Sequence, residues 1–266
     1  MPDLSPNVLR KEILRMAKAG GSVHVGCAFS MVEIVSCLCR DFLVADEIIC
    51  KKEDSNWLLL SKGHGVMAMY AAFYKMNLLK DLDLDGYFSD GSLLHGLSEA
   101  KVPGFEISSG SLGHGLPIAV GIAFGKKLAG QKGQVYCIVG DGEMNEGPMW
   151  EALLFAGHHQ LANLTVIVDA NGFQAMGTID EVLKMEPFCD KFTSFGFRAM
   201  TCDGHSLAEL KKSFEVNSHL PKAIVARTIK GKGVSFMEHK NEWHYSRLND
   251  DTYQRALKEL GFEANT

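Results

Sequence analysis

The most constraining feature of the sequence is a strand–helix–strand unit over residues 135–177. Two apolar runs, residues 135–139 and 164–169, have the length of buried strands, and an apolar-rich segment over 148–155 separates them. Parallel strands need such a crossover, because the chain must return across the sheet before the second strand begins. We therefore expect an α/β fold with this unit near its centre.

Both strands of the unit end in polar turns that contain glycine. Gly140-Asp141-Gly142 follows the first strand and Asn171 follows the second, thirty positions later (171 − 141), about one βαβ unit. Ligands bind at the carboxyl ends of parallel strands, so the Asp141 and Asn171 oxygens are expected to converge. An isolated Gly-Asp-Gly predicts only a tight turn. In this context it favours a Mg²⁺–diphosphate site, since Mg²⁺ takes few protein oxygens and fills its octahedron with water and phosphate.

The same residues resemble the thiamine diphosphate (ThDP) signature, and residues 140–147 are most similar to those of transketolases. The resemblance implies that the metal ligands are the side chains of Asp141 and Asn171 and the main-chain carbonyl of Phe173. It also implies that Gly142 contacts the diphosphate. The implied metal is Mg²⁺ or another divalent cation such as Ca²⁺ or Mn²⁺.

A second polar, glycine-containing turn follows the apolar strand over residues 57–61. Lys62-Gly63-His64-Gly65 separates that strand from a helix, and backbone N–H groups at a helix start favour anions. From the residues alone, phosphate binding by Lys62 and His64 and an ordinary tight turn are equally favoured. Transketolases carry a histidine in this turn near the cofactor diphosphate, so the resemblance assigns His64 to the site.

Three further loop histidines gain roles only through the resemblance. On its own, His24 is interpreted as an exposed loop residue, but its segment resembles a transketolase Gly-His-x-Gly segment with Val23 in place of glycine. His95 matches the family histidine near the donor hydroxyls, and His244 matches a histidine on a mobile loop. With His64, these are the candidate general acids, bases or hydroxyl binders, because neutral imidazoles suit proton exchange near pH 7.

A glycine-rich loop over residues 108–115 resembles the transketolase loop that lies against the cofactor's aminopyrimidine. Gly110 and Leu112 stand at the contacting positions. His114 has no firm catalytic counterpart, and we interpret it as a structural or supporting residue.

Two features concern contact between subunits. Gly121-x-x-x-Gly125 places two small residues on one helix face, which permits tight packing within the domain or contact with a partner chain. The resemblance favours contact with a partner chain. It also matches Glu146 to a residue that links active sites across the subunit interface.

Along the whole chain, six or so strands alternate with helices, which predicts a doubly wound, mainly parallel sheet with helices on both faces, the ThDP diphosphate-binding fold. We expect a single domain over residues 1–266. Ser5 is expected to cap the first helix, and Ser30-Met31-Val32-Glu33 is typical of a capping box.

Composition narrows the class of protein. The 266 residues are 46% hydrophobic, and a net charge of −5 gives no indication of nucleic-acid or membrane-surface binding. Seven cysteines without a Cys-x-x-Cys favour reduced, buried thiols in a cytoplasmic protein. The sequence shows no signal peptide and no apolar run of membrane-spanning length.

The resemblance runs from His24 to His244 and covers the diphosphate-binding module of a transketolase, without the pyrimidine-binding and C-terminal modules. A glutamate of the pyrimidine-binding module promotes cofactor activation in this family, and no residue here matches it. We therefore expect one component of a split transketolase, active only with a C-terminal pyrimidine-binding subunit, in an α2β2 assembly. It would transfer a two-carbon ketol unit from a ketose, or ketose phosphate, to an aldose, or aldose phosphate.

Three alternatives stay open at this point: a ThDP enzyme of specialised sugar or secondary metabolism, an α-type subunit of a 2-oxo acid dehydrogenase, and a non-catalytic scaffold subunit. Met176 stands where transketolases usually have aspartate, and Tyr245-Ser246-Arg247 also differs from the sequence expected for the family. These departures leave the sugar undetermined. Lys230 and Lys232, in Lys-Gly-Lys-Gly, are equally compatible with phosphate binding and with a solvated turn.

Overall fold

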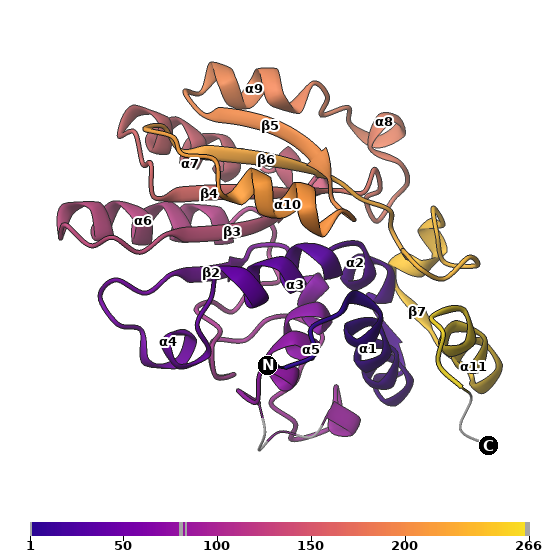
Figure 1. Ribbon diagram of the computed structural model, residues 1–266. Helices are drawn as coiled ribbons and strands as arrows, with labels where there is room; N and C mark the ends of the chain where they lie inside the picture. The colour runs from indigo at the N-terminus through magenta and orange to yellow at the C-terminus, as the bar shows by residue number, and fades with distance from the viewer. Residues whose placement is uncertain (1, 80–81, 83, 264–266) are drawn as a thin grey trace.

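A five-stranded parallel sheet forms the centre of the computed structural model, which describes residues 2–79, 82 and 84–263 (Figure 1). In sheet order the strands are β2 (Trp57–Leu60), β3 (Val135–Gly140), β4 (Leu164–Ala170), β6 (Lys222–Arg227) and β5 (Arg198–Asp203). Two short strands, β1 (Ser22–Val23) and β7 (Ser246–Arg247), form a separate antiparallel pair. The described sheet thus has five strands where the sequence predicted about six.

Helices cover both faces of the sheet (Figure 1). One side carries α6 (Gly115–Leu128), α7 (Gly147–His158) and α9 (Phe188–Ser194). The other carries α1 (Pro6–Gly20), α2 (Val25–Ser30), α3 (Val32–Asp41), α5 (Val66–Lys75) and α10 (Leu207–Phe214), and α11 (Asp250–Glu259) packs against α1 at the margin of the molecule. Side chains alternate between the two resulting cores, so Cys137 enters the core beneath α6 and Ile138 the opposite core. The predicted doubly wound α/β architecture is confirmed.

The remaining elements are short and lie in the connections. They are α4 (Ala45–Cys50), α8 (Ile179–Val182) and four 3₁₀ turns, η1 (Gly63–Gly65), η2 (Leu84–Gly86), η3 (Gly142–Asn145) and η4 (Asn241–His244). Both β3 and β4 are buried along their whole length, which explains why they appear as continuous apolar runs.

Of the two predicted helix caps at the start of the chain, the Ser5 cap is right in position only and the Ser30 capping box is wrong. Ser5 occupies the N-cap position of α1 but makes no side-chain capping bond. Ser30 ends α2 instead of capping α3, and its hydroxyl donates to Asp169 on β4 at 2.5 Å. The Glu33 carboxylate accepts from the Arg10 guanidinium at 2.8 Å. Ser30 and Glu33, which the capping-box pattern assigned to the start of α3, thus bind residues distant in sequence instead.

The glycines of α6 face open space. A Cβ built at Gly121 or Gly125 would meet no atom within 4 Å, and the neighbouring Ile118 is 43% exposed. Tight packing within the described domain is therefore excluded for these glycines, and contact with a partner chain stays a prediction.

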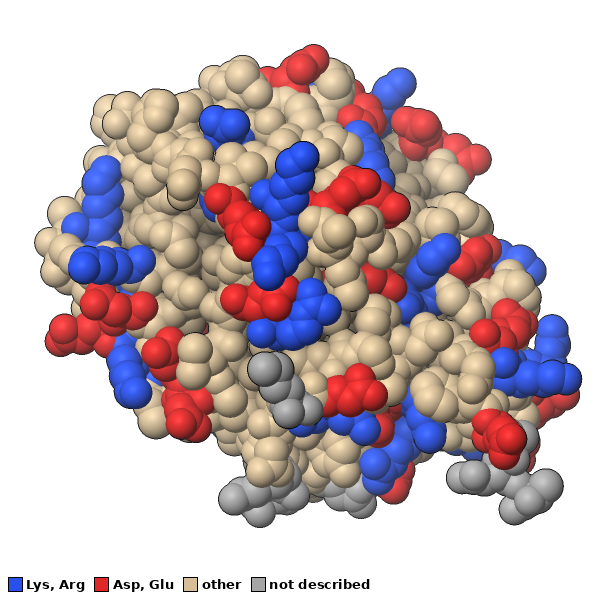
Figure 2. Space-filling model, in the orientation of Figure 1, with Lys and Arg blue, Asp and Glu red and all other residues tan. Residues whose placement is uncertain are grey.

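The surface carries both signs of charge. Figure 2 shows lysines and arginines interspersed with aspartates and glutamates over the face seen there. All seven cysteines are free, and five of them are buried. Among the described residues, no helix has both the length and the apolar character needed to cross a membrane.

Candidate active site

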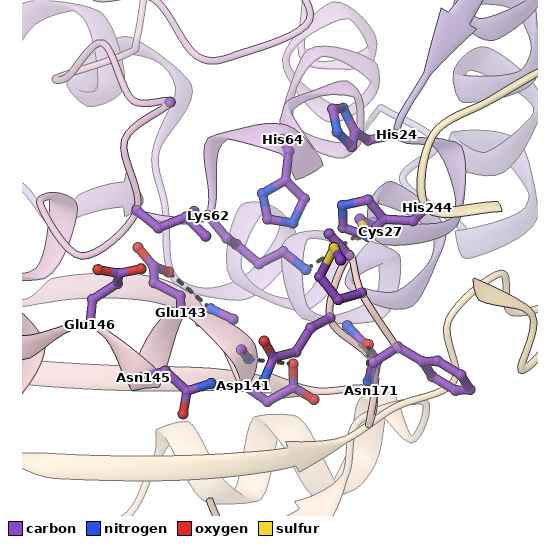
Figure 3. Close-up of a pocket in the computed structure, with 18 of the residues that line it drawn as sticks. His24, Cys27, Lys62, His64, Asp141, Glu143, Asn145, Glu146, Asn171 and His244 are labelled. Atoms are coloured by element: carbon purple, nitrogen blue, oxygen red, sulfur yellow. Dashed lines mark hydrogen bonds between the residues drawn. The ribbon is translucent and has the colours of Figure 1, made fainter. Parts of the chain in front are cut away.

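The candidate site lies at the carboxyl ends of four neighbouring strands. Lys62 follows β2, Asp141 follows β3, Asn171 follows β4 and Lys230 follows β6. A cavity of about 410 Å³, here called the central cavity, opens at this edge (Figure 3). It is lined by most of the site residues that the sequence predicted, namely His24, His64, Gly110, Leu112, Asp141, Gly142, Glu146, Asn171, Phe173 and His244.

Asp141 and Asn171 lie at adjacent strand ends, as their spacing predicted. The Asp141 carboxylate accepts from the backbone N–H of Gly142 at 2.8 Å and of Gly172 at 2.6 Å. The Asn171 side-chain oxygen accepts from the N–H of Phe173 at 3.1 Å. Burial, together with the nearby charge of Asp169, raises the pKa of Asp141 to about 7. A bound cation would offset this unfavourable burial of negative charge.

Asp169 is the centre of a buried polar network that sequence reasoning missed. This last polar residue of β4 is fully buried and pairs with the buried Lys62 ammonium. It also accepts from the hydroxyls of Ser30 and Thr228 and from the Asn171 amide nitrogen, the last at 3.1 Å. Although burial opposes ionisation, these partners hold the pKa of Asp169 below its usual value.

This network fixes two predicted site residues in place. The Asp169 bond fixes the orientation of the Asn171 amide, whose nitrogen donates to Asp169 while its oxygen accepts from the Phe173 N–H at the cavity wall. Lys62, which the sequence left between phosphate binding and an ordinary turn, lines the cavity while its ammonium is held by Asp169.

Glu143 joins three segments beneath the cavity and was also missed from sequence. Its buried carboxylate accepts from the Ser61 hydroxyl at 2.5 Å and from the backbone N–H groups of Gly113 and Gly140, both at 3.0 Å. Burial raises the pKa of Glu143. The carboxylate thereby ties the end of β2, the glycine-rich loop and the end of β3 together.

Three of the four predicted histidines form one cluster, which Figure 3 shows above Lys62. Ring centroids of His24 and His64 are 5.4 Å apart, those of His24 and His244 are 5.2 Å apart, and those of His64 and His244 are 5.6 Å apart. The interpretation of His24 as a solvent-exposed loop histidine is therefore wrong, because the chain folds it against a residue more than 200 positions later in sequence.

The three clustered imidazoles are neutral at physiological pH. Burial, reinforced by the positive charges of Lys230 and Lys62, lowers the pKa of His24 to about 4 and that of His244 to about 3. The pKa of His64 falls well below its usual value for the same reasons. The Lys230 ammonium donates to His244 Nδ1 at 2.9 Å, so the single ring proton of His244 lies on Nε2.

This cluster predicts that the isolated chain loses stability in mild acid. The folded state keeps His24 and His244 neutral, whereas the unfolded state protonates both near pH 6.5, so the unfolded state binds more protons below that pH. Stability is therefore full above pH 6.5 and is lost as the pH falls toward 4. We expect about 1 kcal/mol per pH unit from each imidazole, after allowance for partial exposure.

Urea unfolding at pH 7, 6 and 5 measures this effect. The His24→Gln variant should lose less stability than the wild-type chain over this range. His219→Gln, at an exposed position, is the matched control and should follow the wild type. Equal pH slopes for His24→Gln and the wild type would show that His24 titrates normally in the folded chain.

The remaining predicted residues lie around the central cavity or apart from it. His95 is exposed and does not line the central cavity; it lines an adjoining cavity together with His24. His114 is exposed, and its Nδ1–H donates to the Leu112 carbonyl at 2.9 Å, which is a structural bond. Lys230 is fully buried, so the solvated-turn interpretation is wrong for it, whereas Lys232 is partly exposed and lies 3.6 Å from Glu238.

Comparison with known proteins identifies the family. The family model described as "Transketolase, thiamine diphosphate binding domain" matches residues 7–266. The chain belongs to this transketolase family. Its fold is also that of solved transketolases: the enzyme from Campylobacter jejuni superposes with a TM-score of 0.90 at 27% identity, over 98% of this chain and 43% of that one.

Among curated relatives, this transketolase-family chain resembles proteins of its own size. It is 34% identical over 257 residues to an apulose-4-phosphate transketolase subunit from Actinobacillus succinogenes, covering 95% of this chain and 93% of that protein. It is 34% identical over 258 residues to the 6-deoxy-6-sulfo-D-fructose transketolase subunit SqwG of a Clostridium species, covering 96% and 94%. Human transketolase is 32% identical over 96% of this chain, which spans 41% of that enzyme.

The central cavity of this family member fits thiamine diphosphate with a divalent cation. Gly142 has bare backbone at the cavity wall, where a Cβ would lie 2.8 Å from the Gln174 side chain. The Gln174 amide nitrogen is buried there without a hydrogen-bond partner, which leaves a donor for an anionic group. Within the described residues no group of three or more His, Cys, Asp or Glu side chains is arranged to hold a metal.

Proposed function

We propose that this chain is the cofactor-anchoring subunit of a two-chain transketolase that depends on thiamine diphosphate and Mg²⁺. The enzyme would transfer a two-carbon ketol unit from a ketose or its phosphate to an aldose or its phosphate. The observation that carries the proposal is the gathering of Asp141, Asn171 and three neutral histidines at the carboxyl ends of neighbouring parallel strands. The two relatives of similar length, both named as transketolase subunits, support it.

The proposed metal site consists of the Asp141 carboxylate, the Asn171 amide oxygen and the main-chain carbonyl of Phe173. Mg²⁺ suits this small oxygen set, and Ca²⁺ or Mn²⁺ are the alternatives. Gly110, Leu112 and Gly142 would contact the organic cofactor, and all three line the central cavity.

Thiamine diphosphate, when bound, would supply a carbon nucleophile for the sugar carbonyl and a sink for the electrons of the broken C–C bond. This chain holds the diphosphate end and presents imidazoles to the sugar. His24, His64 and His244 are proposed to exchange hydrogen bonds and protons with substrate hydroxyls, since neutral rings both donate and accept. His95 is proposed to extend this contact from the adjoining cavity.

The proposed partner carries the pyrimidine-binding module and a C-terminal domain, and the assembly is a two-plus-two heterotetramer. Three observations support a partner: Glu146 is exposed at the rim of the central cavity, the α6 face at Gly121 and Gly125 is open, and the relatives of similar length are named as subunits. The seven free cysteines support a reducing, cytoplasmic location.

Reconstitution tests the proposed function. The chain alone should bind thiamine diphosphate in a Mg²⁺-dependent manner in calorimetry yet transfer no ketol unit. Addition of a candidate chain with the two other modules should produce transfer, measured as formation of the new ketose by NMR. Absence of cofactor binding both alone and with the partner would favour a scaffold subunit. Release of CO₂ from a 2-oxo acid would favour a dehydrogenase subunit.

A further inference from the structure

A second cavity adjoins the central one, and beyond the His95 contact proposed above it has no assigned role. Its volume is about 340 Å³, and we call it the outer cavity. It shares His24 and Leu97 with the central cavity, so the two cavities border each other at the His24 imidazole. His95, which matches a substrate-contacting histidine by sequence, lines only the outer cavity of the two.

The outer cavity presents aromatic rings from distant parts of the sequence. Tyr245 is 55% exposed, and its ring centroid lies 4.9 Å from that of His24. Phe88 is 47% exposed and has a positive φ of 61°, a conformation costly for a bulky residue. Its backbone N–H donates to the Leu94 carbonyl at 2.8 Å, and its ring packs over Gly96. These contacts fix the backbone of Phe88 and place its ring against Gly96 in the lining of the outer cavity.

The charge of the lining is one-sided. Glu99 contributes a carboxylate, and no lysine or arginine lines the outer cavity among the described residues; Lys101 lines a separate, smaller cavity on the other side of Glu99 and His95. The Glu99 carboxylate is oriented by the Ser108 hydroxyl, which donates to it at 2.8 Å. A phosphate placed here would meet a like charge without a lining cation, whereas hydroxyl groups would find a carboxylate acceptor and two imidazoles. Aromatic rings also suit the C–H faces of a sugar chain.

We infer that the outer cavity binds the substrate end remote from the reacting carbons, and that this end is a neutral, hydroxyl-bearing chain rather than a phosphate. This inference rests on the proposed function and specifies its substrate class. Tyr245 and Glu99 are the specificity-determining residues of the outer cavity. Tyr245 follows His244 in the segment that differs from the sequence expected for transketolases.

Kinetics of the reconstituted enzyme test the charge argument. D-ribose and D-ribose 5-phosphate serve as acceptors, since they share a carbon skeleton and differ in the terminal phosphate. Glu99→Lys should raise the ratio of kcat/KM for the phosphate ester over that for ribose at least tenfold. Glu99→Gln should raise it by a smaller factor. Glu53→Lys, an exposed charge reversal just before β2 and hence at the opposite edge of the sheet, should leave the ratio unchanged. An unchanged ratio in Glu99→Lys would overturn the inference.

Binding to the chain without its partner separates this inference from the proposed function. Saturation-transfer NMR on the chain with thiamine diphosphate and Mg²⁺ should show contact with D-ribose, and Tyr245→Ala should abolish it. A stronger saturation-transfer signal for D-ribose 5-phosphate than for D-ribose, or a D-ribose signal that persists in Tyr245→Ala, would overturn the inference. If no partner yields ketol transfer, the proposed function fails, but these NMR results still decide what the outer cavity binds.

Discussion

Asp141→Asn should weaken Mg²⁺-dependent thiamine diphosphate binding by at least roughly 100-fold. Mutation of a residue that only hydrogen-bonds to a metal ligand already lowers metal affinity by about 10–100-fold, and Asp141 is proposed to be a ligand itself. Asp141 is the only carboxylate in the proposed ligand set, so the substitution removes the charge that attracts the cation. The side chain stays nearly isosteric, and calorimetry of the isolated chain measures the change.

The same variant should change the stability of the metal-free chain by only about 1 kcal/mol, because two effects oppose each other. Burial and the nearby Asp169 charge disfavour the ionised Asp141, so a neutral amide relieves repulsion, but the amide can accept from only one of the two backbone N–H groups, of Gly142 and Gly172, that the carboxylate binds. Asp180→Asn, at an exposed position on α8, is the matched control and should bind the cofactor normally. Wild-type affinity in Asp141→Asn would remove this residue from the metal site.

Lys62→Met should lower the free energy of unfolding by about 3–5 kcal/mol, the range for removing one partner of a buried ion pair. The substitution leaves the Asp169 carboxylate fully buried with only neutral donors around it. Urea unfolding at pH 7 measures the loss. The effect concerns folding as well as function, because Asp169 also orients Asn171.

A double variant separates the buried charge from simple loss of packing. Lys62→Met combined with Asp169→Asn should recover about half of the lost stability, because no unpaired charge remains and the neighbouring hydroxyls still have an acceptor. Lys211→Met is the matched control: Lys211 lies 3.9 Å from Asp41, is about half exposed, and should change stability by less than about 1 kcal/mol. If Lys62→Met is as mild as this control, the pair contributes little to the fold.

The centre of the fold and the proposed metal ligands were predictable because they depend on local patterns. Two apolar runs of strand length with a helix between them imply adjacent parallel strands, and residues just after such strands meet at one edge. Asp141 and Asn171 therefore converge as expected. The resemblance added His64 and His244, which no periodicity identifies.

Other parts of the site depend on partners that are distant in sequence. Asp169 had only a weak signal, a charged residue at the end of an otherwise apolar strand, and its partner Lys62 is 107 positions away. The capping-box pattern at Ser30 was misleading for the same reason, since its hydroxyl is used by Asp169. Gln174 and Glu99 lie in loops whose paths follow no periodic rule.

By itself, the sequence determined the α/β class, the order of the central strand–helix–strand unit and the edge of the sheet where Asp141 and Asn171 converge. These follow from hydrophobic periodicity and turn chemistry, which act over a few neighbouring residues. Only the tertiary structure decided that His24, His64 and His244 form one neutral cluster, that Lys62 neutralises Asp169, and that an acidic, aromatic cavity adjoins the site. Burial and distances between segments far apart in sequence set these properties, and they exist only once the chain has folded.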